Sequence, residues 1–557
     1  MSGPEIGTWF YSLAMAAAPD VEGVRIAELV AALSYAADLG LGQPMAHCMR
    51  QTVIAQRLAE LVGASEAERE ATYYLGLLLN VYCHADASEQ AKWFGDDISF
   101  KGDTYDMLEL STAQAIAFIF RRVASHGSVG QRAKRLARFA TSGQKEVMAF
   151  LTTHSTLGSQ FAERLGLSVE ACRAIKQGYE HWDGQGVPAG LAGNQISLAS
   201  RLVHFASPIE VFDRRRGVEA ARTLARRQRG GEFDPVVADA FFEHASTVVA
   251  DLDDAADWDA ILHAEPVLSR RVSGAELDDV LLAMADLVDM KSPYLAGHSR
   301  GVANLASAAA RVGGMSEDDV TTLRRAGYLH DLGRLGVSNA IWDKTTPLSE
   351  SELERIRLHP YLTDRMLARI VALGRCREIA SRHHERLDGS GYPRGLTAVS
   401  LTPCDRILAA ADVYHGRIEP RPYRAGFEPD KAASHLHAEV KAGRLDGSAV
   451  DAVLTAAGHR APARRAWPAG LTAREVDVLQ LVARGYSNKQ IATDLVVSPR
   501  TVAHHVEHIY TKLGVSNRAL ATFFATEHGL MGSYESELGG PAEKMGSMTH
   551  VRIEPPK

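Results

Sequence analysis

The chain has 557 residues, enough for three or four domains of about 150 residues each. Its 46% hydrophobic and 23% charged residues exclude a disordered or collagen-like protein. Its net charge of −7 excludes a uniformly basic nucleic-acid coat, although not a small DNA-reading module. The five cysteines form no CxxC pair, so we expect neither a disulfide framework nor a cysteine zinc site.

No segment approaches the roughly 18 uninterrupted apolar residues of a membrane-spanning helix. The N-terminal residues lack the basic region and apolar core of a signal peptide. We therefore expect a cytoplasmic protein without membrane contact.

Apolar residues recur at i, i+3 and i+4 almost throughout the chain, whereas alternating β-branched runs are nearly absent. This pattern is typical of amphipathic helices, so the sequence predicts an all-α fold. Composition changes divide the chain, and the last segment is rich in Gly, Ser, Glu and Pro, which predicts disorder. The expected parts are a helical domain at 25–250, an acidic linker at 251–274, a helical domain at 275–460, a compact unit at 468–531 and the tail at 532–557.

The two helical domains repeat one another. Residues 180–191 (EHWDGQGVPAGL) and 385–396 (ERLDGSGYPRGL) share Glu, Asp-Gly, Gly, Pro and Gly-Leu at an offset of 205. The same offset places His154 on His359. Because several anchors recur in the same order, we interpret the two domains as copies of one helical fold in tandem.

The second copy carries the ligand types of a dinuclear metal site. Adjacent ligands occur as His330-Asp331 and His383-His384. Neighbouring side chains on a helix point about 100° apart, so an adjacent pair serves two ions better than it chelates one. Two ions about 3.5–4 Å apart suit phosphodiester hydrolysis, and imidazole and carboxylate ligands favour Fe, Mn, Zn or Ni over Cu. The candidate ligands are His298, His330, Asp331, His359, His383, His384 and Asp412.

Any one of the 22 histidines, taken alone, is more commonly a surface or packed core residue than a ligand. Their sequence context supports the metal interpretation. AGYLHDLGRLGV (326–337) resembles the HD motif of the HD phosphohydrolase superfamily, and HHERLDGSGYPRGL (383–396) resembles the signature of its HD-GYP branch. The resemblance covers about 275–460 and implies an all-helical domain that hydrolyses cyclic di-GMP to pGpG or GMP.

The resemblance maps the family's seven metal ligands onto the seven residues above, and it implies a catalytic role for Asp331. Family members bind two or three Fe or Mn ions. Trinuclear members carry a Glu one turn before the first His, where this chain has Tyr294. We therefore expect two divalent ions, Fe or Mn first and Zn or Ni as alternatives.

The resemblance also indicates residues that bind the substrate. Arg421 and Arg424 lie in a segment that resembles the family's basic stretch after the last ligand, and both could form charge-assisted hydrogen bonds to phosphates. The alternative for this segment is an Arg-rich solvated turn. Tyr392 and Pro393 either shape the turn or contact the ligand.

Two positions depart from the family. Arg334 replaces the lysine that follows the HD motif, and arginine keeps the charge but cannot release a proton near neutral pH. Turnover falls if the lysine protonates the leaving group and changes little if its role is electrostatic. His415 stands where an Asp is usual.

The first copy lacks most of the ligands. Its frame has Leu79-Asn80, Gly178-Tyr179 and Ser207 in place of ligands, and it keeps only His47 and His154. Two neutral ligands cannot hold a dinuclear centre. We therefore expect a degenerate HD-GYP-like domain with a structural, dimerising or sensory role.

Residues 471–515 predict three short helices. Thr472 begins the first helix through a capping box and Gly485 ends it. Asn488 starts the second, and Ser498-Pro499 start the third. This spacing predicts a helix-turn-helix whose later helix enters the major groove of DNA.

From Leu471 to about Leu530 the sequence resembles the LuxR-type four-helix DNA-binding domain, through LTxRE, GYSNKQIA, SPRTVxxH and KLGVSNR. Relatives place groove-contacting lysines where this chain has Ala503 and Glu507, so we expect weak binding by one module and a homodimer on two half-sites of a specific operator. A protein-interaction bundle is the alternative. The candidate DNA contacts are Lys489, Arg500, Thr501, His504, Lys512 and Arg518.

Together these segments predict a transcriptional regulator that couples a phosphodiesterase for a cyclic dinucleotide to a DNA-binding output. Two alternatives remain. The metal domain could sense a nucleotide with little turnover, or it could act on another phosphoester.

Overall fold

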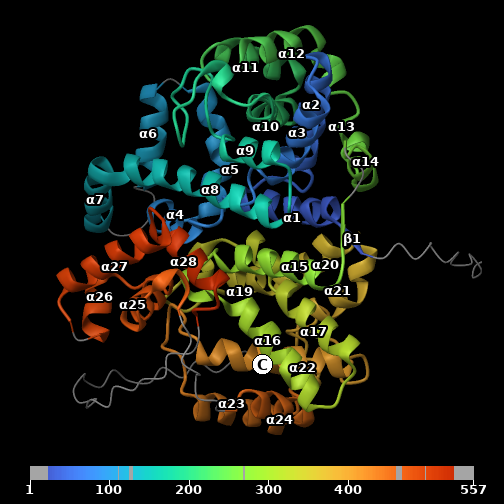
Figure 1. The fold of residues 1–557 in the computed structure, drawn as a ribbon, viewed down its shortest axis with the longest axis vertical. Helices are drawn as coiled ribbons and strands as arrows, with labels where there is room; N and C mark the ends of the chain where they lie inside the picture. Colours follow the sequence, from blue (N-terminus) through green and yellow to red (C-terminus); the bar gives the residue numbers. More distant parts are fainter. Residues whose placement is uncertain are drawn as a thin grey trace, which may run out of the picture.

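The computed structural model describes residues 23–110, 112–123, 129–266, 270–458, 467–495 and 497–531. The tail expected to be disordered lies outside these residues. The all-α prediction is confirmed, since the only sheet among the described residues pairs β1 (Val24–Arg25) with β2 (Arg271–Val272). No helix in these ranges is long and apolar enough to cross a membrane. Two helical units lie one above the other, and a smaller unit sits beside their junction (Figure 1).

The first unit buries alanine- and leucine-rich helix faces around α1, which is almost entirely buried. An insertion of short helices separates its third and eighth helices. Its helices are α1 (Ile26–Gly40), α2 (His47–Leu61), α3 (Glu66–Leu78), α4 (Ala87–Phe94), α5 (Asp97–Thr104), η1 (Tyr105–Glu109), α6 (Thr112–Val123), α7 (Val129–Arg138), η2 (Phe139–Gly143), α8 (Gln144–Arg164), α9 (Val169–Lys176), η3 (Gly193–Gln195), α10 (Leu198–Arg216), α11 (Val218–Gln228) and α12 (Pro235–Val248).

The second unit follows the same helix order with a shorter insertion. Its helices are α15 (Gly274–Asp289), η4 (Pro293–Leu295), α16 (His298–Val312), α17 (Glu317–Leu329), η5 (Leu332–Gly336), α18 (Asn339–Trp342), α19 (Glu350–Arg357), α20 (His359–Leu367), η6 (Val371–Leu373), α21 (Gly374–Ala380), α22 (Pro403–Ile418), α23 (Pro429–Lys441) and α24 (Gly447–Ala456).

Buried carboxylates recur at matching places in the two units. Glu180 accepts hydrogen bonds from the backbone N–H groups nine and eleven residues further on, and Glu385 accepts the same pair. Asp38 and Asp289 each accept one from the N–H ten residues further on. A buried charge is tolerated only when such partners satisfy it, so these bonds fix the irregular segments of each unit in the same shape.

The segment predicted to be a linker is packed rather than extended. It contains α13 (Leu252–Ala255), α14 (Trp258–His263) and the second strand. Trp258 is 2% exposed and stacks on Tyr35 of α1. The sequence signal was the run of acidic residues, which lie on the exposed sides of these short helices while the apolar residues between them are buried.

The C-terminal unit contains η7 (Pro468–Gly470), α25 (Ala473–Ala483), α26 (Asn488–Asp494), α27 (Pro499–Leu513) and α28 (Arg518–Glu527). The predicted capping box is confirmed, because Thr472 Oγ1 accepts from the Glu475 backbone N–H while the Glu475 carboxylate accepts from that of Thr472. Ser498 caps α27 as predicted. Four helices around one small core match the predicted helix-turn-helix unit.

Candidate metal centre and DNA-reading module

The seven candidate metal ligands converge at one place in the second unit. They come from helix ends, where a side chain can point along the axis into the bundle, and from the middle of α22. His298 begins α16, His330 and Asp331 follow α17, His359 begins α20, His383 and His384 follow α21, and Asp412 lies in α22.

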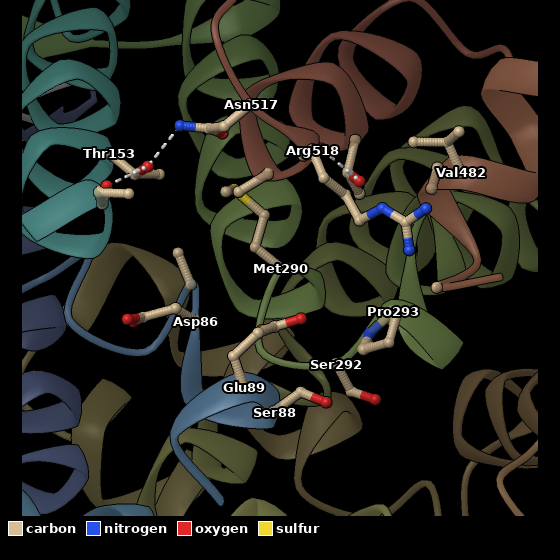
Figure 2. Close-up of a pocket in the computed structure, with 16 residues that line it drawn as sticks. Asp86, Ser88, Glu89, Thr153, Met290, Ser292, Pro293, Val482, Asn517 and Arg518 are labelled. Atoms are coloured by element: carbon tan, nitrogen blue, oxygen red, sulfur yellow. Dashed lines mark hydrogen bonds between the residues drawn. The ribbon is translucent and has the colours of Figure 1, made fainter. Parts of the chain in front are cut away.

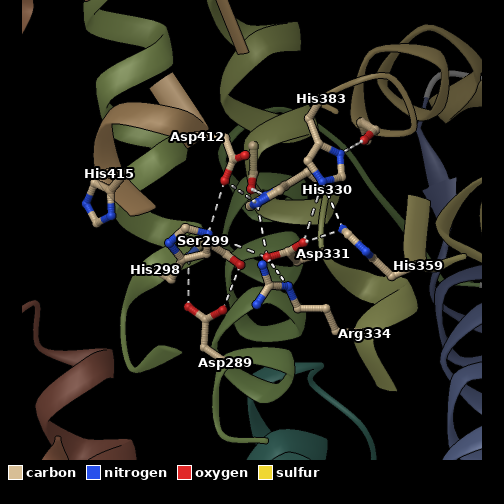
Figure 3. A network of polar contacts seen from close by, with 12 residues as sticks. Asp289, His298, Ser299, His330, Asp331, Arg334, His359, His383, Asp412 and His415 are labelled. Atoms are coloured by element: carbon tan, nitrogen blue, oxygen red, sulfur yellow. Dashed lines mark hydrogen bonds and ion pairs between the residues drawn. The ribbon is translucent and has the colours of Figure 1, made fainter. Parts of the chain in front are cut away.

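Asp331 lies between two sets of imidazole nitrogens (Figure 3). Its Oδ2 is 3.5 Å from His298 Nε2 and 3.2 Å from His330 Nε2. Its Oδ1 is 3.4 Å from His359 Nε2 and 3.6 Å from His383 Nε2. The two oxygens of one carboxylate thus face two separate groups of ligands, as a bridging aspartate between two ions does.

Asp412 joins the same two groups from the opposite side. Its Oδ1 is 3.4 Å from His298 Nε2, and its Oδ2 is 3.8 Å from His384 Nδ1. The His384 ring lies 4.2 Å from that of His383, measured between centroids. One group is therefore completed by Asp412 Oδ1 and the other by His384.

Backbone carbonyls orient the imidazoles. The Nδ1 atoms of His330, His359 and His383 lie 2.8, 2.6 and 2.6 Å from carbonyl oxygens three residues earlier. Each Nδ1–H therefore donates to the end of the preceding helix, which leaves Nε2 on the side of the ring that faces Asp331. Such partners fix the tautomer of metal-binding histidines.

The centre contains buried polar atoms that only a ligand would satisfy. His298 and His330 are fully buried. Their Nε2 atoms and Asp331 Oδ1 have no hydrogen-bond partner. An unpaired buried polar group is costly, and divalent cations satisfy nitrogen and carboxylate donors together. The donor set therefore fits two divalent ions.

The electrostatics of the protein alone keep Asp331 and His383 in the forms that bind a metal. Burial acts to raise the pKa of Asp331, but the charges of Arg334 and His330 outweigh it and hold that pKa well below its usual range. Burial and the neighbouring His330 and His359 lower the pKa of His383 to about 3. Near neutral pH the carboxylate is therefore ionised and the His383 imidazole is neutral. At His298 burial acts to lower the pKa, but Glu419 and Asp412 outweigh it and raise that pKa to about 10.

Arg334 is held against the Asp331 carboxylate. Its Nε lies 2.6 Å from Asp331 Oδ2, and its guanidinium stacks 4.4 Å above the Trp342 ring. The side chain therefore has one partner on the aspartate and one aromatic support, an arrangement that orients Asp331.

Replacing Arg334 tests whether its role is electrostatic. Because the guanidinium contacts Asp331, we expect Arg334→Met to lower kcat by about 10–100-fold, the usual cost of losing a partner of a metal ligand. Arg334→Lys keeps the charge and should stay within about threefold of the native rate, with an unchanged pH profile. Steady-state rates of phosphodiester hydrolysis by each variant, measured between pH 6 and 9, give kcat and the pH profile. A several-fold gain in Arg334→Lys, with a new basic limb, would instead assign a proton-donor role.

The predicted phosphate-binding residues differ in their surroundings. Arg421 donates to the Tyr294 carbonyl at 2.7 Å and to Glu419 at 2.9 Å, beside the metal ligands. Arg424 donates only to backbone carbonyls, which end α22 and shape the following loop. In this structure Arg424 is thus committed to the backbone, while Tyr392 lies with its ring 4.7 Å from that of His384.

Sequence reasoning missed Glu419. Its carboxylate lies 2.9 Å from His298 Nδ1 and 2.8 Å from His415 Nδ1, and it accepts from Arg421. It therefore orients the first ligand and links it to Arg421. The available signal was its position seven residues after Asp412, directly after the end of α22.

In the first unit a tyrosine hydroxyl lies between His47 and Ser207, the residues that match His298 and Asp412 of the second unit. His47 Nδ1 lies 2.5 Å from Glu210, and the Tyr105 hydroxyl lies 3.3 Å from His47 Nε2 and 3.2 Å from Ser207 Oγ. His154 pairs instead with Asp86 at 2.7 Å. The two remaining histidines thus have protein partners rather than a shared centre.

The predicted DNA contacts separate into two groups. Lys489, Arg500, Thr501 and His504 are exposed, the last three on α27. The other two have partners inside the protein: Lys512 pairs with the Glu475 carboxylate at 2.6 Å, and Arg518 donates to the Tyr486 carbonyl at 2.6 Å.

Arg518 faces the helical units rather than the exposed side of α27 (Figure 2). It lines a cavity of about 290 Å³ where the C-terminal unit meets both helical units. Asn517 donates to Thr153 Oγ1 of α8 at 2.6 Å across this junction, and Arg300 of α16 donates to the Glu527 carbonyl at 3.1 Å. The α28 helix therefore docks against both units.

Comparisons with known proteins agree with this architecture. The family model described as "HD domain" matches residues 137–232 and 283–449, and the one described as "Bacterial regulatory proteins, luxR family" matches residues 469–525. The 3'3'-cGAMP-specific phosphodiesterase 3 of Vibrio cholerae serotype O1 is 31% identical over 423 residues, which cover 74% of this chain and 92% of that protein.

Two further relatives cover different shares. The cyclic di-GMP phosphodiesterase response regulator RpfG of Xanthomonas campestris pv. campestris is 32% identical over 181 residues, 32% of this chain and 47% of that protein. A crystal structure of a cyclic GMP-AMP-specific phosphodiesterase of V. cholerae superposes with a TM-score of 0.53 at 26% identity, covering 78% of this chain and 98% of that one.

Proposed function

This chain belongs to the HD domain family, in its HD-GYP branch, and we propose that its second unit is a metal-dependent phosphodiesterase that cleaves a cyclic dinucleotide. The observation that carries the proposal is the bridging position of Asp331, whose two oxygens face two sets of histidines. Relatives whose names give cyclic di-GMP or 3'3'-cGAMP as substrate make these two molecules the first candidates.

The residues would divide the work as follows. Asp331, Asp412 and the five histidines would hold two divalent ions, which when bound would supply hydroxide at neutral pH and offset charge on the phosphoryl oxygens. Carbonyl-bound histidines keep the ligand geometry fixed, so little reorganisation is needed during the reaction. Arg334 keeps Asp331 ionised and oriented. Arg421, tied to the centre through Glu419, would hold a substrate phosphate.

Metal content and product formation test this proposal together. We expect protein purified without oxygen to contain two Fe or Mn ions per chain and to convert cyclic di-GMP or 3'3'-cGAMP to linear products, pGpG or GMP for the former, as separated by chromatography. Two ions without a product from either compound would favour another phosphoester or the sensor alternative. Absence of metal would contradict the proposal.

We propose that the C-terminal unit binds a specific operator as a homodimer and that the metal centre controls it through η4. Close packing supports this path. Gly297, the residue before His298, lies so near Met531 that a Cβ added to the glycine would be 3.0 Å from the Met531 side chain. Pro293 similarly lies against Gly485. The segment between them carries the Tyr294 carbonyl that binds Arg421. A nucleotide that moves Arg421 would therefore disturb a segment that supports the DNA-binding unit.

A further inference from the structure

Two histidines and a glutamate, side-chain types that can bind a metal, meet in the first unit, and the group includes neither His47 nor His154. His181 lies in the loop after α9, His204 on α10, and Glu232 in the turn between α11 and α12. Glu232 Oε1 is 3.3 Å from His204 Nε2 and 3.7 Å from His181 Nε2. The imidazole centroids are 5.0 Å apart. Three segments that are distant in sequence thus present one ligand atom each to a common point.

The spacing fits a tetrahedral ion. Zinc binds imidazole nitrogen and carboxylate oxygen at about 2.0–2.2 Å, so the ligand atoms of a tetrahedral site lie about 3.3–3.6 Å apart. The two measured distances to Glu232 bracket this range, and all three ligand atoms lie within 4.8 Å of one another. A small rotation of the His181 ring would complete the site.

The site is held by its backbone. The N–H groups of Trp182 and Asp183 donate to the carbonyls of Glu232 and Gly231 at 3.2 and 3.0 Å. These bonds join the loop after α9 to the turn after α11, while His204 is fixed within a helix. His204 Nε2 is buried and faces Glu232 Oε1 at 3.3 Å without hydrogen-bond geometry, so a cation at the common point would satisfy both atoms.

The cluster combines a carboxylate with two imidazoles and stays open to solvent. Burial and the nearby His204 lower the pKa of His181. Burial acts to raise the pKa of Glu232, but the two imidazoles outweigh it and lower that pKa. The side chains are 16–32% exposed, which leaves water access to a fourth coordination position.

The second unit lacks these ligands at the matching positions. In the aligned frame His181, His204 and Glu232 correspond to Arg386, Ala409 and Arg444, and Arg444 pairs with a carboxylate at 2.6 Å. The cluster is therefore separate from the ligands shared by the two copies and from the proposed catalytic centre.

We infer that His181, His204 and Glu232 bind one Zn²⁺ with an open fourth position, and that this ion ties the loop after α9, α10 and the α11–α12 turn together. Three protein ligands and a water are the usual set for zinc with an open position. The inference is independent of the proposed phosphodiesterase, because it uses no residue of that centre.

The test is zinc binding to full-length protein carrying Asp331→Ala, which removes the bridging ligand of the other centre. After chelation, equilibrium dialysis against ZnCl₂ should give one more equivalent in this protein than in the same protein carrying His204→Ala. Glu232→Gln should lose the same equivalent, and circular dichroism verifies the fold of each variant. Substituted Co²⁺ should give the intense visible bands of a tetrahedral site, which both variants lose.

The matched control is His244→Ala, an exposed histidine on α12 of the same unit. It should keep the full zinc equivalent, the Co²⁺ bands and the rise in melting temperature that zinc causes. Equal zinc binding by His204→Ala, Glu232→Gln and His244→Ala would overturn the inference, as would Co²⁺ bands that survive in the first two.

Discussion

Replacing Asp331 with alanine is expected to abolish hydrolysis, with kcat lower by at least about 10³-fold, because metal-assisted activation of water supplies much of the rate enhancement. Both oxygens of this carboxylate face imidazole nitrogens, so the variant should lose both ions rather than one. Metal analysis by mass spectrometry and product chromatography measure the two effects on the same sample.

The first unit offers the matched control. Asn80 occupies the position of Asp331 in the repeated frame and is also buried. We expect Asn80→Ala to retain metal and rate, because Glu210 and Tyr105 contact both ring nitrogens of His47. Asp331→Asn, which keeps the shape of the side chain, separates loss of charge from loss of packing. Retained metal and turnover in Asp331→Ala would contradict the bridging role.

The convergence of the candidate metal ligands could be predicted because four of them are adjacent in the sequence. His330-Asp331 and His383-His384 leave little choice of geometry once they sit at helix ends, and the structure brings both pairs to one centre. The caps of α25 and α27 were likewise local, each set by a Ser or Thr that accepts from a backbone N–H three residues on. Local signals of this kind survive folding unchanged.

Other features depend on packing between distant segments. Tyr105 enters the first unit from an insertion whose length gives no hint of its destination, and Glu419 gains importance only because it reaches His298. Arg424 was predicted to bind a phosphate because it lies in a segment that resembles the family's basic stretch. In the structure it donates instead to backbone carbonyls near the end of α22. The docking of α28 could not be predicted for the same reason. Its sequence has two apolar faces, and nothing in it indicates which part of the protein covers the second face.

A second large effect is expected from a substitution that weakens the contact between α28 and the helical units. Phe523 of α28 is 4% exposed and packs into the core of the helical units, whereas the core of the C-terminal unit uses Ala521 and Ala525. Phe523→Ala should therefore release the unit without unfolding it. Truncating a buried Phe costs about 3–5 kcal/mol, enough to shift a docking equilibrium by more than 100-fold. We expect faster hydrogen exchange in α28 and in the facing parts of α8 and α15.

Release should also uncouple the two activities. On a duplex selected by the native protein, a cyclic dinucleotide in excess should change the Kd of native protein for DNA by about 5–150-fold, the usual range of coupling between sites. In Phe523→Ala the same addition should change it by less than about twofold. The neighbouring Phe524 packs on the core of the C-terminal unit and stacks on His528, so Phe524→Ala should weaken DNA binding while leaving the nucleotide response intact.

If Phe523→Ala keeps that response, the signal does not pass through the docked α28. If native protein shows no response at all, the metal centre and the DNA-binding unit act independently.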